Sequence, residues 1–152
     1  MKYKWFLGEV SIGYRRTDLD EKLIKTQIRN SDHAANFFRG IFPEEVMEHH
    51  EEMWVGYLNY ANKPIGFMQL GKGNTHSTVV DVKALVQGAV MCNSSAVIMM
   101  HNHPSGGRNA SNEDIKITSQ IKRGLELFDI KLVDHIILTT DSHTSMAEEG
   151  LI

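Results

Sequence analysis

The fold of this chain is decided at residues 96–114, where the sequence reads AVIMMHNHPSGGRNASNED. The segment opens with five apolar residues, which predict a buried strand running into His101. A Pro-Ser-Gly-Gly turn follows His103, and Ser111 then stands where the N-cap of a helix is expected. No other segment combines so clear a strand–turn–helix pattern with so many potential metal ligands.

The two histidines of this segment are spaced so that they share one side of the predicted strand. Residues i and i+2 of a strand point to the same face, so His101 and His103 can direct both imidazoles at one point. A catalytic zinc ion usually takes three protein ligands and a water. Asp114, in the first turn of the helix that Ser111 caps, is the candidate for the third ligand. The pattern predicts a zinc-type site with one open position.

Each part of this pattern has an ordinary explanation when it is taken alone. A His-x-His pair is more often a surface or satisfied core feature than a metal site. Ser111 with Asp114 is also a variant of the common capping box. The hypothesis therefore depends on the two parts occurring together, one at a strand end and one at a helix start.

Length and composition indicate a single soluble domain. The chain has 152 residues, 41% of them hydrophobic, and a net charge of -3. This length suits one domain with a real core, and the lack of basic excess gives no support for a broad nucleic-acid surface. Cys92 is the only cysteine, which excludes a disulfide framework. No apolar run approaches the roughly 18 residues of a membrane span, and no signal peptide is recognised, so a cytoplasmic protein is expected.

Hydrophobic periodicity predicts a mixed α/β sandwich in one domain. Helices are expected to start near residues 31–33, near residues 43–45 and after Asp81. A further helix is expected over residues 112–128. Strands are expected at 53–59, 65–70, 96–101 and 130–138, with a short one near 144–146. Before these elements, residues 4–14 suit a strand, and residues 17–28 suit a helix or an extended arm.

Metal-assisted hydrolysis also requires a group that takes a proton from water, and glutamate does this in many zinc hydrolases. Glu51 and Glu52 stand at the start of the strand predicted at 53–59. Alternation places them on opposite faces, so one can point into the site while the other cannot. The sequence alone leaves this choice open. His49 and His50, just before them, are typical of a surface connection.

A longer motif resembles a known superfamily. His101-x-His103-Pro104, followed by Ser111 and Asp114 and preceded by a glutamate, is similar to the JAMM (MPN+, JAB) metalloprotease motif. The run HNHPSG at 101–106 and the run LVDHII at 132–137 resemble the RadC branch of that superfamily. The likeness covers about residue 31 to the C-terminus, which gives a RadC-like JAB/MPN domain at 31–152 after an N-terminal extension at 1–30.

The resemblance carries expectations for fold and site. It implies an α-β-α sandwich around a mixed sheet, like that of cytidine deaminases, and a Zn²⁺-bound water held by His101, His103 and Asp114. Ser111 would hydrogen-bond to that water or to the developing oxyanion. Glu51 matches the family glutamate better than Glu52, which stays in reserve. His135 is taken as a satisfied histidine rather than a ligand.

The resemblance also frames the functional alternatives. JAMM enzymes cleave peptide or isopeptide bonds, so the leading hypothesis is zinc-dependent amide hydrolysis of a peptide or isopeptide substrate. The RadC branch carries a DNA-repair label, so one alternative is a protein that acts on DNA or binds DNA or DNA-repair proteins. Another is a non-catalytic interaction module. Residues 1–30 are too short for the helix-hairpin-helix region of a full-length RadC protein, which removes the part most easily linked to DNA. No membrane partner is expected.

Overall fold

The computed structural model of the protein describes residue 21 and residues 25–73 and 80–152. The strand predicted at 4–14 and most of the helix or arm predicted at 17–28 lie outside the described residues. The elements in chain order are α2 (Ser31–Ile41), the 3-10 turn η1 (Glu44–Val46), β1 (Glu52–Leu58), β2 (Pro64–Lys72), α3 (Val82–Met91), β3 (Ala96–Asn102), α4 (Asn112–Glu126), β4 (Lys131–Leu138) and β5 (His143–Ser145).

The five described strands form one mixed sheet in the order β2-β1-β3-β4-β5. The hairpin of β1 and β2 is antiparallel, β1 is antiparallel to β3, and β3 is parallel to β4. All seven residues of β3 are buried, as expected for an almost wholly apolar strand between two neighbours. The strand that carries His101 is therefore the centre of the sheet.

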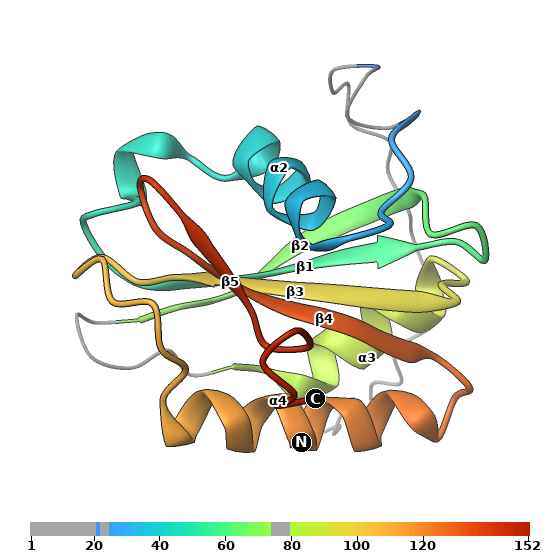
Figure 1. The fold of residues 1–152 in the computed structure, drawn as a ribbon. Coiled ribbons are helices and arrows are strands. Elements are labelled where there is room, and N and C mark those ends of the chain that lie inside the picture. The colour runs from blue at the N-terminus through green and yellow to red at the C-terminus, as the bar shows by residue number, and fades with distance from the viewer. Residues whose placement is uncertain (1–20, 22–24, 74–79) are drawn as a thin grey trace, which may run out of the picture.

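Helices cover both faces of this sheet, which confirms the predicted α/β sandwich (Figure 1). Helix α2 lies on one face, while α3 and α4 lie on the other. Side chains alternate between the two layers, so that Ile98 and Met100 of β3 pack on the α2 side while Val97 and Met99 pack on the α3 and α4 side. Gly56 of β1 lets α2 approach closely, because a Cβ there would stand 2.8 Å from the ring of Phe37.

Side-chain caps fix where the helices begin. The carboxylate of Asp81 accepts a hydrogen bond from the backbone N–H of Ala84, as the sequence predicts for α3. Helix α4 begins after Ser111 with a complete capping box, also as predicted. The cap of α2 is Asn30, whose side chain accepts from the N–H of His33. The short last strand is present as β5.

Two predictions about the region before β1 are wrong. The helix expected from residue 43 is a single 3-10 turn. His49 and His50 were expected at the surface, but the side chain of His50 is only 12% exposed. The cause is Asn102, whose side-chain amide donates to the carbonyls of Met47 and His50. These bonds draw the chain onto the sheet and away from a helical path. None of the helices within the described residues is long and apolar enough to cross a membrane.

Candidate metal centre

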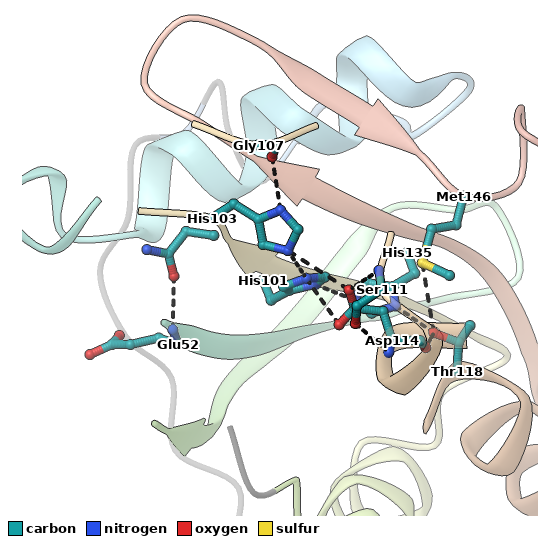
Figure 2. A network of polar contacts seen from close by, with 10 residues as sticks. Glu52, His101, His103, Gly107, Ser111, Asp114, Thr118, His135 and Met146 are labelled. Atoms are coloured by element: carbon teal, nitrogen blue, oxygen red, sulfur yellow. Dashed lines mark hydrogen bonds and ion pairs between the residues drawn. The ribbon is translucent and has the colours of Figure 1, made fainter. Parts of the chain in front are cut away.

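Three side chains from two elements converge at the carboxyl end of β3 (Figure 2). His101 and His103 come from this strand end, and Asp114 comes from the first turn of α4. The two Nε2 atoms lie 2.9 Å apart, and the Nε2 of His101 lies 3.2 Å from Oδ1 of Asp114. The Nε2 of His103 lies 3.7 Å from Oδ2 of the same carboxylate. The predicted ligand trio is thus assembled in space.

Backbone contacts orient the two more exposed members of this trio. The Nδ1 of His103 lies 2.8 Å from the carbonyl oxygen of Gly107. A carbonyl only accepts, so Nδ1 carries the hydrogen and Nε2 presents a lone pair to the centre. Oδ2 of Asp114 accepts from the N–H of Ser111, and Oγ of Ser111 accepts from the N–H of Asp114. The capping box therefore both starts the helix and orients the carboxylate.

The electrostatics of the trio favour a positive charge at its centre. The neighbouring carboxylate of Asp114 raises the pKa of His103, with smaller contributions from Gly107 and from the charge of Glu51, against the effect of burial. Burial alone would raise the pKa of Asp114, but the adjacent imidazoles of His101 and His103 and the backbone N–H of Ser111 hold it well below its usual range. The carboxylate stays ionised, which suits a cation held between the three side chains.

The spacing of the three ligand atoms suits a small tetrahedral ion. Ligand atoms about 2.0–2.1 Å from a tetrahedral zinc ion stand about 3.3 Å from one another. The two Nε2 atoms stand 2.9 Å apart, and each lies 3.2 or 3.7 Å from its nearer carboxylate oxygen, values that bracket this spacing. Two imidazole nitrogens with one carboxylate oxygen is also a donor set that zinc and other first-row metals accept. His101, His103 and Asp114 could hold a metal ion.

Glu51 and Glu52 lie on opposite sides of the sheet. Met53 of β1 is paired with His101, so continuing the antiparallel register by two residues sets Glu51 beside His103. The charge of Glu51 acts on His103, which agrees with this position. Glu51 is half-buried, whereas Glu52 is buried with its carboxyl group pointing away from the trio (Figure 2).

Glu52 belongs to a separate group, which we call the Glu52 cluster and define as His50, Glu52, Trp54 and Asn102. Oε1 of Glu52 lies 2.8 Å from Nε2 of His50, and Oε2 accepts from the indole N–H of Trp54 at 2.9 Å. The backbone N–H of Glu52 donates to the side chain of Asn102. Asn102, which stands between His101 and His103 in sequence, thus faces the opposite layer and has a structural role.

Sequence reasoning left His135 out of the site, and the structure sets it against His101. Nε2 of His135 lies 2.8 Å from Nδ1 of His101, and its Nδ1 lies 2.6 Å from Oγ1 of Thr118. Burial lowers the pKa of His135, and the charge of His101 lowers it further. His135 is not one of the three converging ligands. The contact of His135 with His101 depends on the pairing of β4 with β3, which no local sequence pattern indicates.

Comparison with known proteins identifies the relatives of this chain. The family model described as the RadC-like JAB domain matches residues 28–151. A UPF0758 protein of Coprothermobacter proteolyticus is 34% identical over 88% of this chain and 56% of its own length. A UPF0758 protein of Flavobacterium johnsoniae is 36% identical over 90% of this chain and 58% of its own length. The chain thus spans a little over half the length of these curated relatives.

Proposed function

The chain belongs to the RadC-like JAB domain family, and we propose that it is a zinc-dependent hydrolase that cleaves amide bonds in a peptide or isopeptide substrate. The observation that carries the proposal is the convergence of three potential ligand side chains on one point. His101, His103 and Asp114 supply three ligand atoms, the usual number of protein ligands in a catalytic zinc site, which leaves a position for water. A zinc ion held there would acidify that water and polarise the scissile carbonyl.

Glu51 is the proposed general base and acid. The register of β1 on β3 sets Glu51 beside His103, and the charge of Glu51 raises the pKa of that histidine, which supports a role next to the metal position. In the reaction it takes a proton from water as the oxygen attacks the amide carbon. The C–N bond then breaks, and Glu51 returns the proton to the departing nitrogen. A half-buried carboxylate beside the ligands suits this exchange better than the fully engaged carboxylate of Glu52.

Ser111 is proposed to stabilise the negative charge that develops on the carbonyl oxygen. Its Oγ accepts from the N–H of Asp114, which leaves the hydroxyl hydrogen for another acceptor. Ser111 is exposed at the start of α4, where backbone N–H groups also favour negative charge. The residue can therefore serve as helix cap and as donor to a substrate at the same time.

The proposal is tested with a library of peptides and isopeptide-linked peptides, incubated with zinc-loaded protein with and without a chelator. We expect cleavage that the chelator abolishes. Glu51→Gln should retain zinc and the folded state while its rate falls about 10²–10⁴-fold, because a positioned acid–base group contributes that much.

The matched control is Glu52→Gln, which makes the same chemical change one residue away and on the other face of the sheet. Its rate should stay close to that of the unmodified protein. Loss of cleavage in Glu52→Gln with retention in Glu51→Gln would contradict the assignment of the base. The absence of any metal-dependent cleavage across the library would contradict the hydrolase itself.

A further inference from the structure

The imidazole of His101 is held from behind by two buried side chains of other elements (Figure 2). Nδ1 of His101 lies 2.8 Å from Nε2 of His135 on β4. Nδ1 of His135 lies 2.6 Å from Oγ1 of Thr118 on α4. His101, His135 and Thr118 are 3%, 0% and 1% exposed, so water does not compete for these contacts. This chain of contacts runs from the helix of one metal ligand to the ring of another.

The single hydroxyl hydrogen of Thr118 fixes the direction of the contact with His135. The hydroxyl lies 2.6 Å from the backbone carbonyl of Asp114, which can only accept. The sulfur of Met146, at 3.8 Å, is a second and weaker acceptor for the same hydrogen. The carbonyl of Asp114 has no hydrogen, so a 2.6 Å separation of the two oxygens requires the hydroxyl hydrogen to lie between them, away from the imidazole. Nδ1 of His135 must therefore carry a hydrogen and donate it to Oγ1 of Thr118.

The same counting extends to His101. Full burial favours the neutral form of His135, because a charged ring removed from water is costly. A neutral imidazole carries one hydrogen, which is already on Nδ1, so Nε2 accepts. The partner of that nitrogen is Nδ1 of His101, which must then donate. The remaining nitrogen of His101, Nε2, presents a lone pair toward His103 and Asp114.

We propose that Thr118 and His135 are positioning residues that fix the tautomer of His101, so that its Nε2 stays unprotonated and directed at the metal position. This inference deepens the proposed function and rests on its metal site. It predicts a role for both residues that needs no contact with metal or substrate. Partners of this kind orient metal-ligating histidines and strengthen their binding.

The most selective variant is Thr118→Val, which keeps the shape of the side chain and removes its oxygen. Nδ1–H of His135 then has no acceptor, whereas the other tautomer, with the hydrogen on Nε2, keeps the hydrogen bond to His101 and buries no unpaired N–H group. His101 must then accept at Nδ1, which moves its own hydrogen to Nε2, where it blocks the metal. Thr118→Ser keeps the hydroxyl and should behave as the unmodified protein. Met146→Leu removes only the weak sulfur acceptor and serves as a second control.

Two measurements read out this change without any substrate. Long-range ¹H–¹⁵N NMR of metal-free protein at pH 8 assigns the histidine tautomers. We expect the hydrogen of His101 on Nδ1 in the unmodified protein and in Thr118→Ser, and on Nε2 in Thr118→Val. Competition of Zn²⁺ between the protein and a chromophoric chelator should show affinity reduced about 10–100-fold in Thr118→Val only.

The outcomes separate this inference from the proposed hydrolase. The expected tautomers and zinc affinities in a protein without hydrolysis support the inference and contradict the proposed function. A hydrogen on Nε2 of His101 in the metal-free unmodified protein overturns the inference, whether or not Thr118→Val folds. An unchanged tautomer and unchanged zinc affinity in folded Thr118→Val overturn it as well, even where peptide cleavage is found.

Discussion

Two groups of polar side chains lie at the same end of the sheet, one on each face. On the α4 face, His101, His103 and Asp114 turn their lone pairs toward one point. On the α2 face, the Glu52 cluster contains the same residue types, an acid with a histidine, but each carboxylate oxygen of Glu52 has its own partner. Strand pairing ties the two groups together, because Met53 next to Glu52 pairs with His101.

The difference between the two groups is the direction of their hydrogen bonds. In the Glu52 cluster, donors and acceptors are paired with one another, as buried polar groups normally are. In the trio, the donors of the histidines point outward, with the Nδ1 of His103 bonded to Gly107 and that of His101 beside His135. The acceptor atoms, which are the two Nε2 atoms and the carboxylate oxygens of Asp114, point inward with no hydrogen-bond donor of the described residues between them. The first arrangement stabilises the fold, and the second leaves room for a cation.

The largest expected effect on folding is that of Glu52→Leu. This change leaves the indole N–H of Trp54 and a nitrogen of His50 buried without their acceptor. Orphaned buried groups cost about 1–3 kcal/mol each, so we expect the free energy of unfolding to fall by about 3 kcal/mol. Urea denaturation of the metal-free protein measures this. Zinc affinity should stay within about threefold, since Glu52 faces away from the trio.

His103→Ala, which alters the trio and leaves the Glu52 cluster intact, is the control for that prediction. It should abolish tight zinc binding yet alter the free energy of unfolding of metal-free protein by less than about 1 kcal/mol, as for a site away from the packed core. A large loss of stability in His103→Ala together with none in Glu52→Leu would reverse the comparison.

A smaller effect is expected for Trp54→Phe, which removes only one donor of the Glu52 cluster. The indole ring stacks on Phe67 and meets Phe42 edge-on, and phenylalanine preserves much of this aromatic packing. The lost hydrogen bond to a carboxylate should lower the free energy of unfolding by about 2 kcal/mol. Calorimetry at neutral pH gives the value. An unchanged stability would mean that the Glu52 carboxylate gains nothing from the indole.

The smallest effect concerns Tyr57, which lies on the α4 face but far along β1 from the trio. Its hydroxyl donates to the carbonyl of Leu85 and packs against Gly88. Burial raises the pKa of Tyr57, with a smaller contribution from Cys92. The stabilisation tied to the protonated hydroxyl is therefore complete below the unfolded-state pKa of about 10 and is lost as pH rises above it.

Tyr57→Phe tests this account of the α4 face. We expect a loss of about 1 kcal/mol at pH 8 and a flatter decline of stability between pH 9 and 11 than in the unmodified protein. Denaturant titrations across that range give both quantities. An equally steep decline in the variant would show that Tyr57 is not the group that titrates. The result would show whether the Tyr57 hydroxyl stabilises the fold through its own hydrogen bond to Leu85.

Much of the fold follows from local patterns in the sequence. The apolar run before His101 predicted a buried strand, and the Ser111 to Asp114 spacing predicted both a helix start and a carboxylate near the strand end. These predictions concern residues whose partners are close in sequence or share one periodic face. The mixed sheet with helices on both faces followed from the same reasoning.

Other features depend on contacts between distant segments. The chain path before β1 was mispredicted because the side-chain amide of Asn102, more than 50 residues later, donates hydrogen bonds to the carbonyls of Met47 and His50. The proposed preference for Glu51 over Glu52 rests on the register of β1 on β3 and on the partners of Glu52, neither of which a local pattern reveals. His135 contacts His101 only because β4 lies parallel to β3, which alternation within one strand cannot reveal.

The central claim is that His101, His103 and Asp114 form a site for a zinc-type ion, and elemental analysis tests it most directly. Protein purified without added metal and dialysed against metal-free buffer is assayed beside His103→Ala and Glu52→Gln. We expect about one zinc per chain in the unmodified protein and in Glu52→Gln, and almost none in His103→Ala. An absence of bound metal in the unmodified protein, including after incubation with zinc, would contradict the claim.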